Sequence, residues 1–411
     1  MFFSVCQTVV DGYMPDEATM LRHFFDQVAA ADRLGAGTAW IAESHLSCQT
    51  QKKNPGAVIP HFQGEIAVNV DFLQLATHVF HRTRRINCGS AIMNILSNGG
   101  PIAAAERVRA FLLLHGLDPD ERRLLEVGFA AGRFPFIYAP YGVVPRDAVE
   151  RAAWHQVINQ TFDEAVEIFL RLLKGEELSS DDVTRRFLAR DLFRSDEDWA
   201  RVQAAYGSLG GDPAAGRIPV NPRWVFPTLK IIPQDPDLHL LRLTIGSHYP
   251  PTQDFANTIL PCGVFNLSIT PGAEIEATHQ RMLANFHPAG GPWSRRLMPR
   301  TVLVFINEDP GISAAEKNRR AGAAADRALA NYWLALEGTL DPMKVAKATD
   351  NALIGDADTI AAQMRERFHP EDRLMLWFDF NNHDSPRVIR EMEAFFGLVA
   401  PQFQGVPAGA A

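Results

Sequence analysis

Short runs of apolar residues alternate with longer amphipathic segments along most of the chain. There are eight such runs, each continuously apolar, and each precedes at least one segment with a helical repeat of apolar positions. Continuous apolar runs of this length are typical of strands covered on both faces, as in a parallel sheet. The predicted strands are residues 2–5, 38–42, 86–92, 124–129, 240–245, 263–267, 301–306 and 373–378.

Helix signals separate these strands. Asp16 as N-cap and Gly35 as the stop residue bound the first helix, and Ser385 as N-cap with Pro386 at the first helical position begins the last one. The polar stretch 43–65 predicts a long loop. Further helices are predicted over residues 70–80, 102–114 and 158–173, and after Ser313, where Glu316 completes a capping box.

Eight strand-helix units close most economically into an eight-stranded parallel (β/α) TIM barrel with insertions, which is the α/β fold predicted here. An open, doubly wound sheet is the alternative. It is disfavoured because Gln7, Thr8 and Val9 follow the first strand, where a dinucleotide-binding sheet carries a glycine-rich fingerprint.

The chain of 411 residues is predicted to form one domain over residues 1–403. The irregular stretch of about residues 176–237 interrupts the strand-helix rhythm and is interpreted as an insertion. The Gly- and Ala-rich residues 404–411 are predicted to be a disordered tail.

Composition excludes several classes of protein. With 46% hydrophobic and 21% charged residues the chain is expected to fold, and no apolar run approaches the roughly 20 residues that span a bilayer. The first six residues lack the basic start of a signal peptide. A formal charge of -8 without a long basic block argues against a nucleic-acid partner. The four cysteines show no paired spacing, which indicates a reducing cytoplasm.

Reactive groups in a parallel barrel gather at the C-terminal ends of the strands. Glu43 and His45, two positions apart after the second strand, are a candidate general acid/base pair in which the carboxylate orients the imidazole. The alternative is a pair of ordinary exposed loop residues. Gly132 and Arg133, after the fourth strand, are candidates to bind a phosphate, the alternative being a plain turn.

Two further histidines stand one helical turn apart. His78 and His81 have no acidic or cysteine companions, so they are expected to lie at a solvated helix end and not to bind a ligand. No set of residues has the spacing of a metal site, and none is predicted.

Four segments, in register, resemble the bacterial luciferase-like flavin-dependent monooxygenase family. The resemblance covers most of the chain outside the insertion and implies a TIM barrel, reduced FMN (FMNH2) as the cosubstrate that activates O2, and often a dimer. The segments are ADRLGAGTAWIAESHL at 31–46, CGSAI at 88–92 followed by Pro101 and Glu106, EVGFAAGRF at 126–134, and a C-terminal part with LIGDADTIAAQM from 353, FNNHDSP from 380 and FFGLVAPQF from 395.

The resemblance also implies where a flavin would lie. A non-prolyl cis peptide supports the flavin ring after the third strand of the family, and it falls within residues 90–92 here. The family's phosphate contacts come from the turn after strand four and from hydroxyl groups after strand five. The cofactor-binding candidates are therefore Ser90, Ala91, Gly132, Arg133, Ser247 and His248.

Two departures from the family pattern change the expected chemistry. Ser44 replaces the first histidine of the Glu-His-His pattern, the proposed base of luciferases, so only His45 remains. Ala131 stands where an arginine commonly precedes the glycine, with Arg133 as a substitute. Light-emitting oxidation of long-chain aldehydes is therefore not expected.

The function predicted from the sequence is that of a cytoplasmic, two-component FMN-dependent monooxygenase. It is expected to take reduced flavin from a separate flavin reductase, to use O2 on an apolar organic substrate of specialised metabolism, and to form a homodimer without a nucleic-acid or membrane partner. A deazaflavin-dependent oxidoreductase and a non-catalytic flavin-binding protein are the alternatives, and Ser44 favours either of them.

Overall fold

The computed structural model describes residues 1–53, 62–132, 134–336 and 349–403. It divides into two compact units, which are described separately below. Unit 1 comprises Met1–Met93, Pro119–Phe129 and Leu238–Ala411, and unit 2 comprises Asn94–Asp118 and Ala130–Asp237. The single domain inferred from the sequence stays a prediction, and the predicted tail at 404–411 lies outside the described residues.

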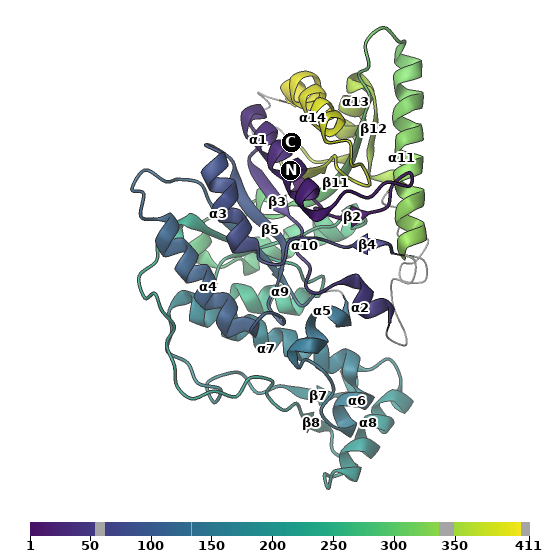
Figure 1. Cartoon of the computed structure of the whole chain (residues 1–411). Coiled ribbons are helices and arrows are strands. Elements are labelled where there is room, and N and C mark those ends of the chain that lie inside the picture. Colours follow the sequence, from purple (N-terminus) through teal and green to yellow (C-terminus); the bar gives the residue numbers. More distant parts are fainter. Residues whose placement is uncertain (54–61, 133, 337–348, 404–411) are drawn as a thin grey trace. The chain divides into compact units, whose positions relative to one another are not determined.

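Parallel strands form the core of unit 1 (Figure 1). Six of them pair in the order β1-β3-β5-β6-β9-β10, and three more pair in the order β12-β11-β13. The first sheet contains β1 (Phe2–Phe3), β3 (Thr38–Ile41), β5 (Asn87–Asn94), β6 (Leu125–Ala130), β9 (Leu241–Ile245) and β10 (Cys262–Val264), and the second contains β11 (Arg300–Ile306), β12 (Leu353–Gly355) and β13 (Leu374–Trp377).

The predicted α/β class with parallel strands is confirmed, and each of the eight predicted strands corresponds to an observed one. Asn266, just after β10, forms a parallel bridge to Arg300 of β11, which joins the two sheets. Among the described residues no backbone ladder joins β13 to β1, so a hydrogen-bonded, closed barrel is not seen. Strand β12 is an addition to the eight.

Helices of unit 1 begin and end close to the predicted residues. Asp16 accepts a hydrogen bond from the Thr19 amide at the start of the first helix, and Gly35 ends that helix in the left-handed conformation that glycine adopts without strain. The unit contains α1 (Glu17–Leu34), α3 (Phe72–Arg82), α9 (Pro250–Asn257), α10 (Gly272–Asn285), α11 (Ala314–Leu336), α13 (Ala357–Arg367) and α14 (Ser385–Ala394).

Two local predictions in unit 1 are wrong. The N-cap of α14 is Asp384 and not Ser385, because the Asp384 carboxylate accepts the hydrogen bond from the Arg387 amide. The predicted loop 43–65 contains a short helix, α2 (Cys48–Lys52), and a strand, β4 (Gly64–Glu65), that pairs antiparallel with β2 (Gln7–Thr8). The side chain of Glu65 stabilises α2 by accepting hydrogen bonds from the Ser47 hydroxyl and the Cys48 amide.

Unit 2 contains two long helices that pack together, α4 (Gly100–His115) and α7 (Trp154–Lys174), with short α5 (Pro135–Tyr138) and α6 (Ala148–Ala152) between them in the chain. The predicted insertion forms β7 (Phe187–Ala189), α8 (Asp196–Ser208) and β8 (Arg217–Pro219), with β7 and β8 antiparallel. The insertion shares a small hydrophobic core with α6 and the start of α7, which consists of Val149, Ala153, Val157, Leu188, Phe193, Trp199, Val202 and Ile218.

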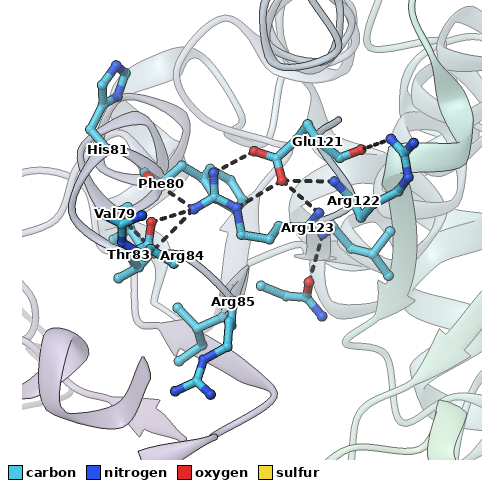
Figure 2. A network of polar contacts seen from close by, with 12 residues as sticks. Val79, Phe80, His81, Thr83, Arg84, Arg85, Glu121, Arg122 and Arg123 are labelled. Carbon is cyan, nitrogen blue, oxygen red and sulfur yellow. Dashed lines mark hydrogen bonds and ion pairs between the residues drawn. The ribbon is translucent and has the colours of Figure 1, made fainter. Parts of the chain in front are cut away.

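A network of polar contacts fastens α3 to the segment that leads into β6 (Figure 2). The Arg123 guanidinium donates to the carbonyl oxygens of Phe80 and Thr83, each at 2.9 Å, and pairs with the Glu121 carboxylate. It also stacks on the Phe80 ring. Because these contacts lie at the N-terminal ends of the strands, they stabilise the side of unit 1 opposite the predicted site.

In the part of the chain that the structure describes, no helix is long and apolar enough to cross a membrane.

Candidate active site

The predicted acid/base pair is in contact. Glu43 and His45 follow β3, and His45 Nε2 lies 3.1 Å from Glu43 Oε1. Because a carboxylate only accepts, Nε2 donates this hydrogen bond when it carries a proton. The side chain of His45 is 4% exposed and that of Glu43 is 2% exposed, so the pair is not an exposed loop dipeptide.

The backbone around the pair is held by neighbouring segments. Glu43 Oε2 accepts a hydrogen bond from the Phe72 amide at the start of α3, a position where the helix dipole favours a negative charge. Asn69 donates through its side chain to the Ala42 carbonyl oxygen and accepts from the Ser44 amide. The carboxylate therefore ties His45 to α3 and fixes the orientation of the imidazole.

Ser90 and Ala91 lie on β5, next to β3. Ser90 is fully buried, and its hydroxyl donates to the Gly128 carbonyl oxygen of β6 at 2.7 Å, so the hydroxyl joins two strands. Gly128 carries no side chain because a Cβ there would lie 2.2 Å from the Ser90 carbonyl oxygen. The non-prolyl cis peptide expected within residues 90–92 is present, between Ala91 and Ile92.

Ser247 and His248 follow β9 and precede α9. Ser247 Oγ accepts a hydrogen bond from the Tyr249 amide, and among the described residues it has no acceptor for its own proton. Pro250 and Pro251 at the start of α9 have no amide proton to offer an anion. A phosphate at this strand end would therefore be bound through side chains, with the Ser247 hydroxyl as the donor nearest to the strand.

The phosphate candidates after β6 belong to the other unit. Gly132 is in unit 2 and has a φ of 85°, a left-handed conformation that favours glycine. A Cβ at Gly132 would lie 2.2 Å from the Asn94 side-chain nitrogen, so the turn packs closely on that amide. Arg133 lies outside the described residues. Glu43, His45, Ser90, Ala91, Ser247 and His248 are all in unit 1.

His78 and His81 are exposed on α3, as expected. Among the described residues, no group of three or more His, Cys, Asp and Glu side chains is placed to bind a metal ion.

A further polar group, outside the predicted site residues, lies at the end of β13. Asp379 Oδ2 accepts hydrogen bonds from the amide and the hydroxyl of Ser4, at 3.2 and 3.0 Å. Burial raises the pKa of Asp379 to about 6, although both Ser4 contacts favour the charged form. Asp379 is identifiable from its position at a strand end, but its partner is not, because Ser4 lies 375 residues earlier.

Replacing Asp379 by asparagine is expected to stabilise the fold at pH 8. A carboxyl whose pKa is raised on folding loses stability as pH rises from its unfolded value to about 6, and asparagine removes that loss. The expected gain in the free energy of unfolding is on the order of 1 kcal/mol, allowing for the partial exposure of Asp379. Urea denaturation at pH 8 and pH 4 measures it, and a gain that is equal at both pH values contradicts the assignment.

Comparison with known proteins shows which family the N-terminal part of the chain resembles. Residues 1–196 match the family described as luciferase-like monooxygenase, which confirms the predicted resemblance. The matched part of the chain contains β1 to β6, with Glu43 and His45 after β3 and Ser90 and Ala91 on β5. None of the curated proteins matches the chain by sequence.

Solved structures share the fold at low identity. The monooxygenase RslO1 from Streptomyces bottropensis is 16% identical, with a TM-score of 0.66 over 98% of this chain and 99% of that chain. The oxygenating constituent of 3,6-diketocamphane monooxygenase from Pseudomonas putida, in complex with FMN, is 14% identical, with a TM-score of 0.57 over 98% and 97%. An F420-dependent secondary alcohol dehydrogenase is 12% identical, with a TM-score of 0.51 over 92% and 94%.

Proposed function

We propose that this chain is an FMN-dependent monooxygenase that uses reduced flavin and O2 to oxygenate an apolar organic substrate. The observation that carries the proposal is the buried Glu43–His45 pair at a strand end inside the segment that matches the luciferase-like family. The strand beside it carries Ser90 and Ala91, the predicted flavin neighbours. A closed eight-stranded barrel is part of the same proposal.

The described residues of unit 1 fit a flavin in two respects. Ser247 has a hydroxyl proton to donate to a phosphate oxygen, and charge-assisted hydrogen bonds of this kind are the stronger ones. Ala91 and Ile92 pack against Trp40, Phe265 and Met375, which gives the sheet interior an apolar wall for a flat ring. When bound, reduced FMN supplies the activation of O2.

The protein's own contribution is to position and to control protons. Glu43 holds the His45 imidazole through Nε2, so we propose His45 as the acid/base group or hydrogen-bond donor and Glu43 as the residue that orients it. Ser90 joins β5 to β6 and keeps Ala91 in place beside the proposed ring position.

An apolar substrate is supported by exposed hydrophobic side chains on the loops that follow the strands of unit 1. Sites for small organic molecules are lined mainly by apolar and aromatic side chains. The exposed side chains on these loops are Tyr13 at 55%, Leu46 at 43%, Tyr249 at 53% and Leu267 at 39% exposed.

The remaining assignments extend the family resemblance. We propose a separate flavin reductase as the source of reduced FMN, a homodimer as the assembly, and the cytoplasm as the location. Specialised metabolism is the proposed source of the substrate.

Two other functions use the same fold. A deazaflavin-dependent oxidoreductase is favoured by the likeness to the F420-dependent alcohol dehydrogenase, and a non-catalytic flavin-binding protein is favoured by Ser44 at the position of the luciferase base. Parallel anaerobic titrations with reduced FMN and reduced F420 distinguish the cofactors. Tight binding of FMN alone is expected, and tight binding of F420 alone would replace the monooxygenase by the deazaflavin enzyme.

A further inference from the structure

Unit 1 contains a cavity of about 440 Å³ between α11, α14 and the segments that follow β2 and β13. Pockets for small molecules typically measure about 300–1,000 Å³, so a compact organic molecule fits here. None of the described candidate site residues lines this cavity. Its inner wall is apolar and mostly aromatic, and consists of the buried side chains of Phe305, Ala328, Phe378 and Phe380.

Glu391 of α14 lines the cavity with one of its two carboxylate oxygens paired. Oε1 accepts a hydrogen bond from Arg387 Nε at 2.8 Å, whereas Oε2 has no partner among the described residues. The Glu391 side chain is only 12% exposed. Burial raises the pKa of this carboxyl to about 7, although the charge of Arg387 favours the ionised form. A cationic donor inside the cavity would pair Oε2 and stabilise the carboxylate.

His383, between β13 and α14, contributes a second unpaired acceptor to the lining. Its Nε2 lies 2.7 Å from the Thr8 carbonyl oxygen, and because a carbonyl oxygen only accepts, Nε2 carries the proton. Burial lowers the pKa of His383, so the ring is neutral at pH 7. Nδ1 of the neutral ring is therefore an acceptor, and no described residue donates to it.

The charges around the cavity favour a cationic ligand over an anionic one. The described lining contains more acidic than basic side chains, namely Asp11, Asp384 and Glu391 against Arg327 and Arg387. Both arginines have access to water, since Arg327 is exposed and the Arg387 side chain is 37% exposed. An organic acid would bring a second carboxylate towards the enclosed Glu391, and like charges in such surroundings repel.

We propose that this cavity is a binding site for a small organic amine. The ammonium group donates to Glu391 Oε2, His383 Nδ1 serves as a second acceptor for the ligand, and the apolar part of the ligand packs on the aromatic inner wall. An ammonium group has donors and no acceptor, so it matches two acceptors that the described residues leave unpaired. The site does not depend on the proposed function, and it is tested separately from the cofactor.

Isothermal titration calorimetry of the full chain with 2-phenylethylamine tests the proposal, with 3-phenylpropionate as an acid of similar size. The amine is expected to bind saturably, and the acid is not. Glu391→Gln keeps the size of the side chain and an acceptor for Arg387 but removes the charge. Its dissociation constant for the amine is expected to rise about ten- to a hundredfold, the loss of one charge-assisted hydrogen bond.

Glu393→Gln is the matched control, because Glu393 is an exposed residue of the same helix that does not line the cavity. Its affinity for the amine should equal that of the wild type. Ala324→Phe is a second test, which leaves Glu391 unchanged. Ala324 lines the cavity from α11 and is partly exposed, so a phenyl group there should occupy the space of the ligand and weaken amine binding at least tenfold.

An unchanged amine affinity in folded Glu391→Gln, or in Ala324→Phe, overturns the proposal, because the amine then binds elsewhere. If Glu391→Gln does not fold, Ala324→Phe alone decides. Saturable binding of 3-phenylpropionate that Arg327→Ala weakens would make the cavity a site for organic acids and also overturns the proposal. A wild-type chain that binds neither probe overturns it as well.

Discussion

His45→Ala is expected to slow product formation from the organic substrate about 10²- to 10⁴-fold, the range for loss of a general acid/base group. The imidazole is positioned for this role because Glu43 holds Nε2 at 3.1 Å and α3 in turn fixes the Glu43 carboxylate. Affinity for reduced FMN should change little. Steady-state kinetics combined with a flavin titration separate the two effects.

His81→Ala provides the control, since His81 is an exposed residue of α3 that should leave turnover unchanged. Glu43→Gln keeps a side-chain oxygen near the imidazole but removes the charge, so the rate of product formation is expected to fall less than in His45→Ala. If His45→Ala turned over at the wild-type rate while binding flavin normally, the pair would have only a structural role.

The second large effect concerns a buried ion pair at the N-terminal ends of the strands. Arg373→Met is expected to lower the free energy of unfolding at pH 7 by about 3–5 kcal/mol, because it leaves a buried carboxylate without its partner. The side chain of Glu126 is completely buried, and Arg373 donates to both of its carboxylate oxygens. Thr38 donates a third hydrogen bond.

The stability that Arg373→Met loses should depend on pH. Burial alone would raise the pKa of Glu126, but the hydrogen bonds and charge of Arg373 and the Thr38 hydroxyl hold it below its ordinary value. A carboxyl with a depressed pKa stabilises the fold above its unfolded pKa, and this contribution is lost as pH falls through the folded value. Urea denaturation from pH 7 downward should therefore show that the difference in the free energy of unfolding between wild type and Arg373→Met becomes smaller.

Arg242→Ala is the matched control, because Arg242 approaches the same carboxylate at 3.7 Å but is 40% exposed. Arg242→Ala should lower the free energy of unfolding by less than about 1 kcal/mol. The double variant Glu126→Met with Arg373→Met should recover much of the stability, since no charge then remains buried. A double variant as unstable as Arg373→Met alone would contradict the ion-pair explanation.

The strands and most helices could be predicted because they depend on local pattern. Each strand of the core is a short apolar run, and the Glu43–His45 contact joins residues two apart at the end of one such run. The helix α2 could not be predicted in the same way. It is five residues long without an apolar stripe, and its start depends on Glu65, which lies 17 residues beyond Cys48.

Contacts between distant strands also could not be predicted from the sequence. Thr38 on β3, Glu126 on β6 and Arg373 just before β13 meet because these side chains point to one interior, and that direction follows from sheet register. For the same reason, the pairing of Ser4 with Asp379 could not be predicted from the sequence. The N-cap of α14 was ambiguous because Asp384 and Ser385 are adjacent and both residue types are good caps.

The reaction of the protein-bound reduced flavin with oxygen tests the central claim most directly. The chain is loaded anaerobically with reduced FMN, mixed rapidly with O2, and followed by absorbance, with hydrogen peroxide measured at the end. If the chain is an FMN-dependent monooxygenase, a long-lived species distinct from both reduced and oxidised flavin should form, and peroxide should appear only as that species decays. Reduced FMN that is not bound, or that oxidises with the course of free flavin, would contradict the account.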